Sequence, residues 1–207
     1  MKHVPFTAKL VASLALAGAA ASVAGLGTFA TFTSATSAQN QALASGTVSI
    51  ALGSTNRLTV GASNIVPGDT IERAVDLTNN GSAGTSQVGA ISLTSSLASA
   101  TSLLDSDATN GLQMQVDSCS QAWTEAGNGT TTPYTYTCGG TTAAVLASRP
   151  VIAAGVALSN MTALTAGNTD RLRIKLTLPA AAGNTFQGLS STIAYVFTAS
   201  QRAAASK

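Results

Sequence analysis

The stretch Arg171-Leu-Arg-Ile-Lys-Leu-Thr-Leu178 indicates the fold class most clearly. Its four apolar residues occupy alternate positions, which is the period-two pattern of a β-strand with one buried face. Pro179 ends this strand, because proline has no N–H to donate to a neighbouring strand. The intervening cations Arg171, Arg173 and Lys175 are interpreted as a solvent-facing strand surface, and an anion-binding site is the alternative.

Short segments of the same kind recur along the chain, separated by glycine, asparagine, serine and proline. Alternating apolar residues follow the turn Pro67-Gly-Asp69, and that strand ends at Asn79-Asn-Gly-Ser82. The segment Ser95–Asp105 lacks alternation and predicts a short helix or helical turn. About nine or ten strands in this arrangement predict an all-β fold, an antiparallel jelly-roll-like β-sandwich. The other candidate strands are 47–52, 57–60, 88–93, 112–117, 134–138, 156–164 and 192–199.

Residues 1–30 are predicted to be an export signal. Lys2 and Lys9 flank the start of the segment, and an apolar stretch rich in alanine and glycine runs from Leu10 to Leu26. This stretch is short and weakly hydrophobic for a permanent transmembrane helix. We therefore expect a secreted protein, in the extracellular matrix or at the cell surface, with an uncleaved N-terminal anchor as the alternative.

Two cleavage sites fit the requirement for small residues. Thr28 and Ala30 predict cleavage after Ala30, and a second site follows Ala38. Cleavage after Ala30 divides the chain into the signal peptide 1–30, an N-terminal assembly or flexible segment 31–45, a β-sandwich domain 46–202 and a tail 203–207.

Charge is sparse in this chain. Charged residues make up 9% of the sequence, against about 25% in typical soluble proteins. Of the ten basic residues, Lys2 and Lys9 lie in the predicted signal, so the remaining eight balance the eight acidic residues. The absence of a basic excess argues against a nucleic-acid partner, and near-zero net charge favours self-association.

The residue types needed for several kinds of catalysis are missing. The only histidine is His3, inside the predicted signal. The processed chain therefore has no Ser–His–Asp or Cys–His catalytic site and no histidine-ligated metal. We expect no enzymatic activity, no catalytic residue, no cofactor and no metal site.

Cys119 and Cys138 are the only cysteines. In an exported protein such a pair predicts a structural disulfide, and the turn-rich sequence 127–133 between them allows two antiparallel strands. A reactive thiol pair is the alternative, although no CxxC motif or cationic neighbour favours it.

Two further stretches have both a functional and a structural interpretation. Asp105-Ser-Asp107-Ala-Thr-Asn110-Gly111 is similar to the start of a Ca²⁺ loop, but its glycine is one position late and Val116 stands where the bidentate glutamate belongs. Capping of a loop by its own aspartates is the preferred interpretation. Trp123 and Glu125 indicate either a binding surface or packing near the disulfide, and packing is preferred.

An ordered set of motifs resembles one family of exported proteins. The set comprises Leu26-Gly-Thr-Phe-Ala-Thr-Phe-Thr-Ser34, with Ser34 where the family has Asp, then Gly46-Thr-Val-Ser-Ile50, Pro67-Gly-Asp69, Val75-Asp-Leu-Thr-Asn-Asn-Gly81, Asn184-Thr-Phe-Gln-Gly188 and the strand Thr192–Gln201. Together they are similar to the TasA/camelysin family, whose signals are processed by SipW-type peptidases. The Cys119…Trp123…Cys138 segment resembles the branch found in high-GC Gram-positive bacteria.

The resemblance implies a jelly-roll domain and a structural role in extracellular biofilm fibres. In such fibres an N-terminal segment of one subunit completes the sheet of the next. A surface-associated binding module is the alternative function. The metallo-endopeptidase activity associated with the camelysin side of the family is a weaker alternative, because the processed chain lacks histidine.

The residues that follow Ala30 fit such an assembly role. The stretch 31–40 has no charged side chain and no proline, so it can pair with an open sheet edge. We expect Thr31, Phe32 and Thr33 to drive association, with Phe32 filling a pocket of the neighbouring subunit. A frayed, disordered terminus is the alternative.

Overall fold

The computed structural model describes residues 33–36, 50–52, 59–81, 88–128 and 132–203. All of them belong to the unit Phe32–Lys207. The described strands are β1 (Thr33–Thr36), β2 (Ile50–Leu52), β3 (Thr59–Ser63), β4 (Thr70–Asn79), β5 (Val88–Leu97), β6 (Gln113–Cys119), β7 (Trp123–Ala126), β8 (Thr135–Cys138), β9 (Thr142–Pro150), β10 (Ala153–Ala157), β11 (Thr169–Thr177) and β12 (Ser190–Gln201). Two short helical segments, α2 (Leu103–Ser106) and the 3₁₀ turn η1 (Asn184–Phe186), accompany them.

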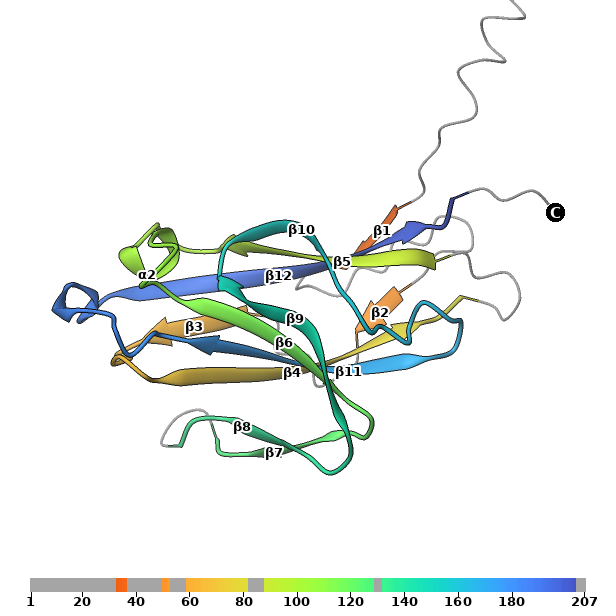
Figure 1. Cartoon of the computed structure of the whole chain (residues 1–207), viewed down its shortest axis with the longest axis horizontal. Helices are drawn as coiled ribbons and strands as arrows, with labels where there is room; N and C mark the ends of the chain where they lie inside the picture. Colours follow the sequence, from red (N-terminus) through yellow and green to blue (C-terminus); the bar gives the residue numbers. More distant parts are fainter. Residues whose placement is uncertain (1–32, 37–49, 53–58, 82–87, 129–131, 204–207) are drawn as a thin grey trace, which may run out of the picture. The chain divides into compact units, whose positions relative to one another are not determined.

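The strands form two five-stranded antiparallel sheets and one hairpin (Figure 1). The β12 sheet has the order β1-β12-β5-β10, and β3 also pairs with β12. The β11 sheet has the order β2-β4-β11-β6-β9. The hairpin consists of β7 and β8. The predicted all-β sandwich is therefore confirmed.

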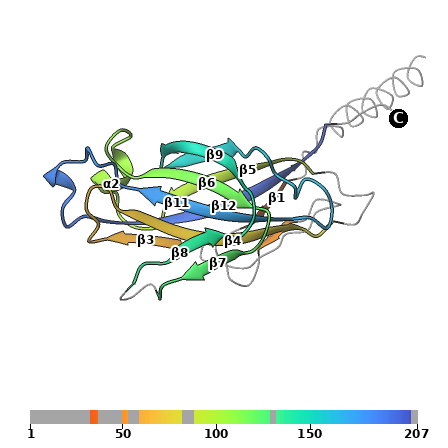
Figure 2. The same cartoon turned by 60° about the horizontal axis from the view of Figure 1, so that its bottom comes forward.

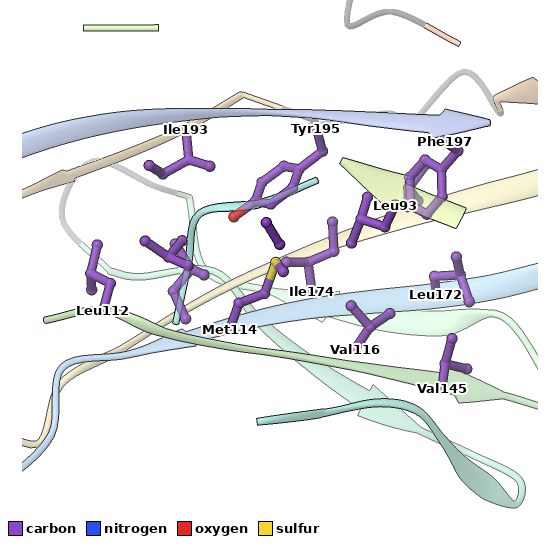
Figure 3. Close-up of a cluster of buried hydrophobic side chains, with 14 of the residues drawn as sticks. Leu93, Leu112, Met114, Val116, Val145, Leu172, Ile174, Ile193, Tyr195 and Phe197 are labelled. Carbon is purple, nitrogen blue, oxygen red and sulfur yellow. The ribbon is translucent and has the colours of Figure 1, made fainter. Parts of the chain in front are cut away.

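The core lies between the two sheets and follows the alternation in the sequence. Along β11 the residues from Thr169 to Thr177 are alternately half-buried and buried, and β12 has the same period over most of its length. Figure 3 shows side chains from both sheets meeting in one apolar cluster. Its fully buried members include Leu93, Met114, Val116, Leu172, Ile174, Ile193, Tyr195 and Phe197.

Both ends of β4 are fixed by the motifs that flank it. In the turn before the strand, Asp69 Oδ2 accepts a hydrogen bond from the Val66 N–H, and Gly68 has a φ of 96°, which favours glycine. At the other end the buried Asn79 donates from Nδ2 to the Ala163 carbonyl at 2.8 Å, and its Oδ1 accepts from the Gly81 N–H. These contacts fix the length and register of β4 against β11.

Three local predictions need correction. The expected helical segment Ser95–Asp105 is mostly not helical, because β5 continues to Leu97 and α2 begins only at Leu103. The predicted strand 156–164 ends at Ala157, where β10 ends. The strands β7 and β9 were not predicted, because fewer than half of their residues are buried and the apolar alternation is missing.

Candidate assembly site

The strand β1 is bound at the edge of the β12 sheet. It pairs antiparallel with the C-terminal part of β12, with Thr33 opposite Ser200 and Thr36 opposite Phe197 (Figure 1). Thr33, a predicted assembly residue, is therefore the first residue of a paired strand. Thr31, Phe32 and the cleavage-site residues Thr28 and Ala30 lie outside the described residues.

Two short strands share this edge of β12. β1 pairs with Phe197–Ser200, and β3 pairs with Ser190–Ala194. Tyr195 and Val196 lie between the two pairings and have no partner residue on this edge among the described strands. The edge is thus divided into two separate strand sites, and the N-terminal strand occupies the one at the C-terminal end of β12.

The sequence of β12 makes this edge suitable for strand pairing. Its twelve residues, from Ser190 to Gln201, include no charged residue and no proline. Charged residues and proline are the usual means by which proteins keep an edge strand from pairing with other chains. Phe197 and Ala199, which lie opposite Thr36 and Ser34 of β1, are completely buried in the core. The part of β12 that pairs with β1 is therefore held in place by side chains buried in the core.

The predicted disulfide is present and holds the β7–β8 hairpin. Cys119, the last residue of β6, is bonded to Cys138, the last residue of β8, with a Cα–Cα distance of 5.7 Å. The hairpin lies beside β4, on the side of the β11 sheet away from the β12 sheet (Figures 1 and 2). The bond thus joins a central strand of the sandwich to an outer element.

Arg173 is the centre of the contact between the hairpin and the β11 sheet. Its Nη2 lies 2.8 Å from Asp117 Oδ2, and its Nη1 lies 3.3 Å from Glu72 Oε1. Its guanidinium stacks 4.7 Å from the ring centroid of Trp123, a cation–π contact that strengthens where water is excluded. Trp123 also donates from Nε1 to the Arg171 carbonyl at 2.9 Å.

The same cluster binds the backbone of β8. The Tyr136 N–H donates to Glu72 Oε2 at 3.0 Å, and Arg173 Nη1 donates to the Tyr136 carbonyl at 3.4 Å. The Tyr136 hydroxyl donates to Glu125 Oε2 at 2.6 Å. Trp123 therefore packs against the β11 sheet, as preferred from the sequence, while the exposed Glu125 binds the Tyr136 hydroxyl within the hairpin. The expectation that Arg173 faces solvent is wrong, because the hairpin covers it.

Asp105 and Asp107 bind groups of their own loop and its neighbours. The carboxylate of Asp105 accepts from the Ser102 N–H and so forms half of a capping box at the start of α2. The same carboxylate accepts from the Ser191 hydroxyl of β12. Asp107 Oδ1 accepts from the N–H groups of Asn110 and Thr109, which hold the pKa of this carboxyl below its usual value. This is the loop capping preferred over a Ca²⁺ loop.

The arrangement of acidic residues does not suit a catalytic zinc ion. Glu72 and Asp117 are the carboxylates that converge, but both are bound to the cationic Arg173, which opposes a second cation between them. Within the described part of the chain, no group of three or more His, Cys, Asp or Glu residues is placed to hold a metal. Histidine, the usual nitrogen ligand of zinc, occurs only at His3.

The comparisons with known proteins give one match. The family model described as camelysin metallo-endopeptidase matches residues 5–206, which is almost the whole chain. No curated protein matches, and no solved structure matches. No helix among the described residues is long and apolar enough to cross a membrane.

Proposed function

Because the chain belongs to the TasA/camelysin family, we propose that it is a secreted structural subunit that assembles into an extracellular fibre by β-strand addition. The observation that carries this proposal is the pairing of β1 with the edge of β12. If β1 occupies the same site on a second copy of the chain, the subunits join one after another.

The pairing of β1 within its own chain is small enough to be exchanged. β1 has four residues, and among the described strands the register pairs it with β12 only. An antiparallel pair of this length makes about four backbone hydrogen bonds, each with a net contribution of about 0.5–1.5 kcal/mol. A copy of β1 from another subunit makes the same bonds, so pairing within one chain and pairing between two chains have similar intrinsic free energies. Which of the two prevails then depends on the protein concentration.

The connection that follows β1 is long enough for such an exchange. The thirteen residues 37–49 join β1 to β2. A chain of this length spans at most about 43–47 Å when extended, which exceeds the length of β12. An exchanged β1 can therefore reach a neighbouring subunit. Since donor and acceptor surfaces differ, the contact is heterologous and extends into a filament unless the rotation closes a ring.

The charge balance supports self-association. With the predicted signal removed, eight basic residues balance eight acidic ones, so long-range repulsion between copies is small. Some of these charges are also neutralised within the subunit, because Arg173 forms ion pairs with Glu72 and Asp117.

The test compares the chain starting at Thr31 with the chain starting at Ser45, which lacks β1. Light scattering and electron microscopy at matched concentrations are expected to show polymers for the first and smaller species for the second. Equal behaviour of the two chains, whether both polymerise or both stay monomeric, contradicts strand addition by β1.

Two other results would favour the other candidate functions. A chain starting at Thr31 that stays monomeric at high concentration favours a surface-associated binding module. Proteolysis of casein that stops on addition of a chelator favours the metallo-endopeptidase named in the family description. The contact of Glu72 and Asp117 with Arg173 leads us to expect no chelator-sensitive proteolysis.

A further inference from the structure

The two candidate cleavage sites lie on opposite sides of β1. A cut after Ala30 precedes the strand, which begins at Thr33. A cut after Ala38 follows the strand, which ends at Thr36, and removes all of it. Either cut is a hydrolysis that consumes one water and leaves a carboxylate on the alanine and an amine on the next residue. The two products differ in whether the subunit retains β1.

We propose that cleavage after Ala38 produces an acceptor-only subunit, which binds β1 of a second copy of this chain at Phe197–Ser200 but has no β1 to donate. This inference rests on the proposed function, and it assigns the N-terminal cut a role in ending fibre growth. A chain cut after Ala30 both accepts and donates. A chain cut after Ala38 still accepts β1 of another copy at β12. Because it has no β1 of its own to donate, no further subunit is added at its other end.

The β12 edge explains why the shortened chain takes up a strand. Without β1, no described strand pairs with Phe197–Ser200 on this side, while β5 still pairs on the other side. The exposed edge carries no charge and no proline that would block pairing. Phe197 and Ala199 stay anchored in the core through their buried side chains. The site is therefore preformed and needs only an extended, uncharged strand.

The second occupant of this edge limits what can bind. β3 pairs with Ser190–Ala194 and remains in a chain that starts at Gln39. An incoming strand therefore has the four residues Phe197–Ser200 and, beyond them, Val196 and Tyr195 before it meets β3. The sequence 31–40 fits this space as an uncharged segment without proline. The partner is thus a second copy of the chain, which carries this segment.

The edge of the β11 sheet at β4 has the opposite character. β2 pairs with β4 only at Leu77–Asn79, and the rest of that strand carries the charged residues Glu72, Arg73 and Asp76. Arg73 donates from Nη1 to the Glu72 carbonyl at 2.6 Å, which occupies a backbone acceptor of this strand. Charge and side-chain capping oppose strand addition there, so we assign the exchange to β12.

The experiment uses a fluorescent peptide with the sequence 31–40 and two forms of the protein, one starting at Thr31 and one at Gln39. Fluorescence anisotropy is expected to show saturable one-to-one binding to the Gln39 form. Binding to the Thr31 form is expected to be at least about tenfold weaker, because its own β1 fills the site. A peptide carrying S34P and A35P is the matched control. Successive residues direct their N–H groups to opposite sides of a strand, so the double replacement removes at least one donor whatever the register.

A second variant covers the case in which the Gln39 form does not fold alone. The S34P/A35P protein starting at Thr31 keeps the full length but vacates the same site, and circular dichroism establishes that it is folded. Either folded form must bind the natural peptide. The inference is overturned if a folded Gln39 or S34P/A35P form does not bind the natural peptide. It is also overturned if the unchanged Thr31 form binds the peptide as tightly as these forms do. Polymers formed by the Gln39 form alone overturn it as well.

Mixing the two forms measures the effect on growth. Adding the Gln39 form to the Thr31 form is expected to shorten the polymers in proportion to its fraction, as seen by electron microscopy. Unchanged polymer length overturns the role in ending growth. If the peptide binds to the Gln39 form but the Thr31 form never polymerises, the acceptor site stands and the proposed fibre function fails, so the two failures are distinguishable.

Discussion

Replacing Tyr195 with phenylalanine tests how the core of the sandwich tolerates a polar atom. Tyr195 lies in the middle of β12 and is completely buried. Figure 3 shows its hydroxyl oxygen pointing into the apolar cluster between the sheets. This oxygen has no hydrogen-bond partner among the described residues. A buried polar group without a partner lowers the free energy of unfolding, so its removal is expected to stabilise the fold.

The size of the effect follows from the loss of solvation. A buried donor without a partner costs about 1–3 kcal/mol, and the void left by the oxygen offsets part of the gain. We expect Tyr195→Phe to raise the free energy of unfolding by about 1–2 kcal/mol. Each kcal/mol corresponds to a rise in Tm of about 2–4 °C for a domain of this size. Urea denaturation at neutral pH, followed by tryptophan fluorescence, measures the change.

Tyr136 provides a control with the same chemical change and the opposite expected sign. Its hydroxyl donates to Glu125 Oε2 at 2.6 Å in the β7–β8 hairpin. Tyr136→Phe is expected to lower the free energy of unfolding by about 0.5–1.5 kcal/mol, because it removes a made hydrogen bond. The opposite signs separate the effect of an unpaired hydroxyl from any general effect of the replacement.

The pH dependence gives an independent measurement on the same residue. Burial raises the pKa of Tyr195 well above its usual value of 10.0. Above that pH the unfolded chain loses this proton while the folded chain keeps it, so stability is present at lower pH and falls as pH rises. The loss is about 1.4 kcal/mol for each pH unit above 10. The Tyr195→Phe protein is expected to lose less stability than the unchanged protein between pH 10 and 11.

Two outcomes refute this reasoning. If Tyr195→Phe destabilises the protein by more than about 1 kcal/mol, the hydroxyl has a favourable partner such as a buried water. If the two proteins lose stability equally above pH 10, Tyr195 is accessible to ionisation in the folded state. Either result would require a polar site in the core of the sandwich.

The strands that the sequence predicts best are those in which one face is buried and the other is more exposed along the whole length. β11 alternates between half-buried and buried residues from end to end, so its period was visible without any structure. β12 behaves in the same way. The prediction of an all-β sandwich depended on such strands, because their spacing and turns leave few alternatives.

The segment 156–164 shows how a loop can imitate this pattern. Met161 and Ala163 are buried although they belong to no strand. Their loop is held by Asp170, whose carboxylate accepts from the N–H groups of Thr162 and Ala163 at 2.9 and 2.8 Å. Asp170 lies in β11 and is itself buried. The sequence shows the apolar residues of this loop. It does not show that the Asp170 carboxylate accepts the backbone hydrogen bonds that a neighbouring strand would otherwise accept.

The contacts of Arg173 could not be predicted for a different reason. Glu72 and Arg173 are separated by 101 residues and Asp117 and Arg173 by 56. Arg173 lies opposite Asp117 only because of the register between β11 and β6. A shift by one residue would place these side chains on opposite faces. The sequence therefore shows the charges but not which of them pair. It likewise does not show that the segment Thr33–Thr36 pairs with β12.

Three further predictions concern the other features of the fold. Reduction of the Cys119–Cys138 disulfide is expected to lower the free energy of unfolding by about 3 kcal/mol while the circular dichroism of the sandwich persists; two titratable thiols before reduction would contradict the bond. Asp170→Ala is expected to lower the free energy of unfolding by about 2–4 kcal/mol in urea, because it leaves the buried Ala163 N–H and the part-buried Thr162 N–H without this acceptor; a change below about 0.5 kcal/mol would show that water replaces the carboxylate. Gly89→Ala is expected to displace the end of β12, because a Cβ there would lie 2.4 Å from the Arg202 Cα. Since trypsin cleaves after arginine, faster tryptic cleavage after Arg202 measures that displacement, and an unchanged cleavage rate would show that the C-terminal end accommodates the methyl group without leaving its place.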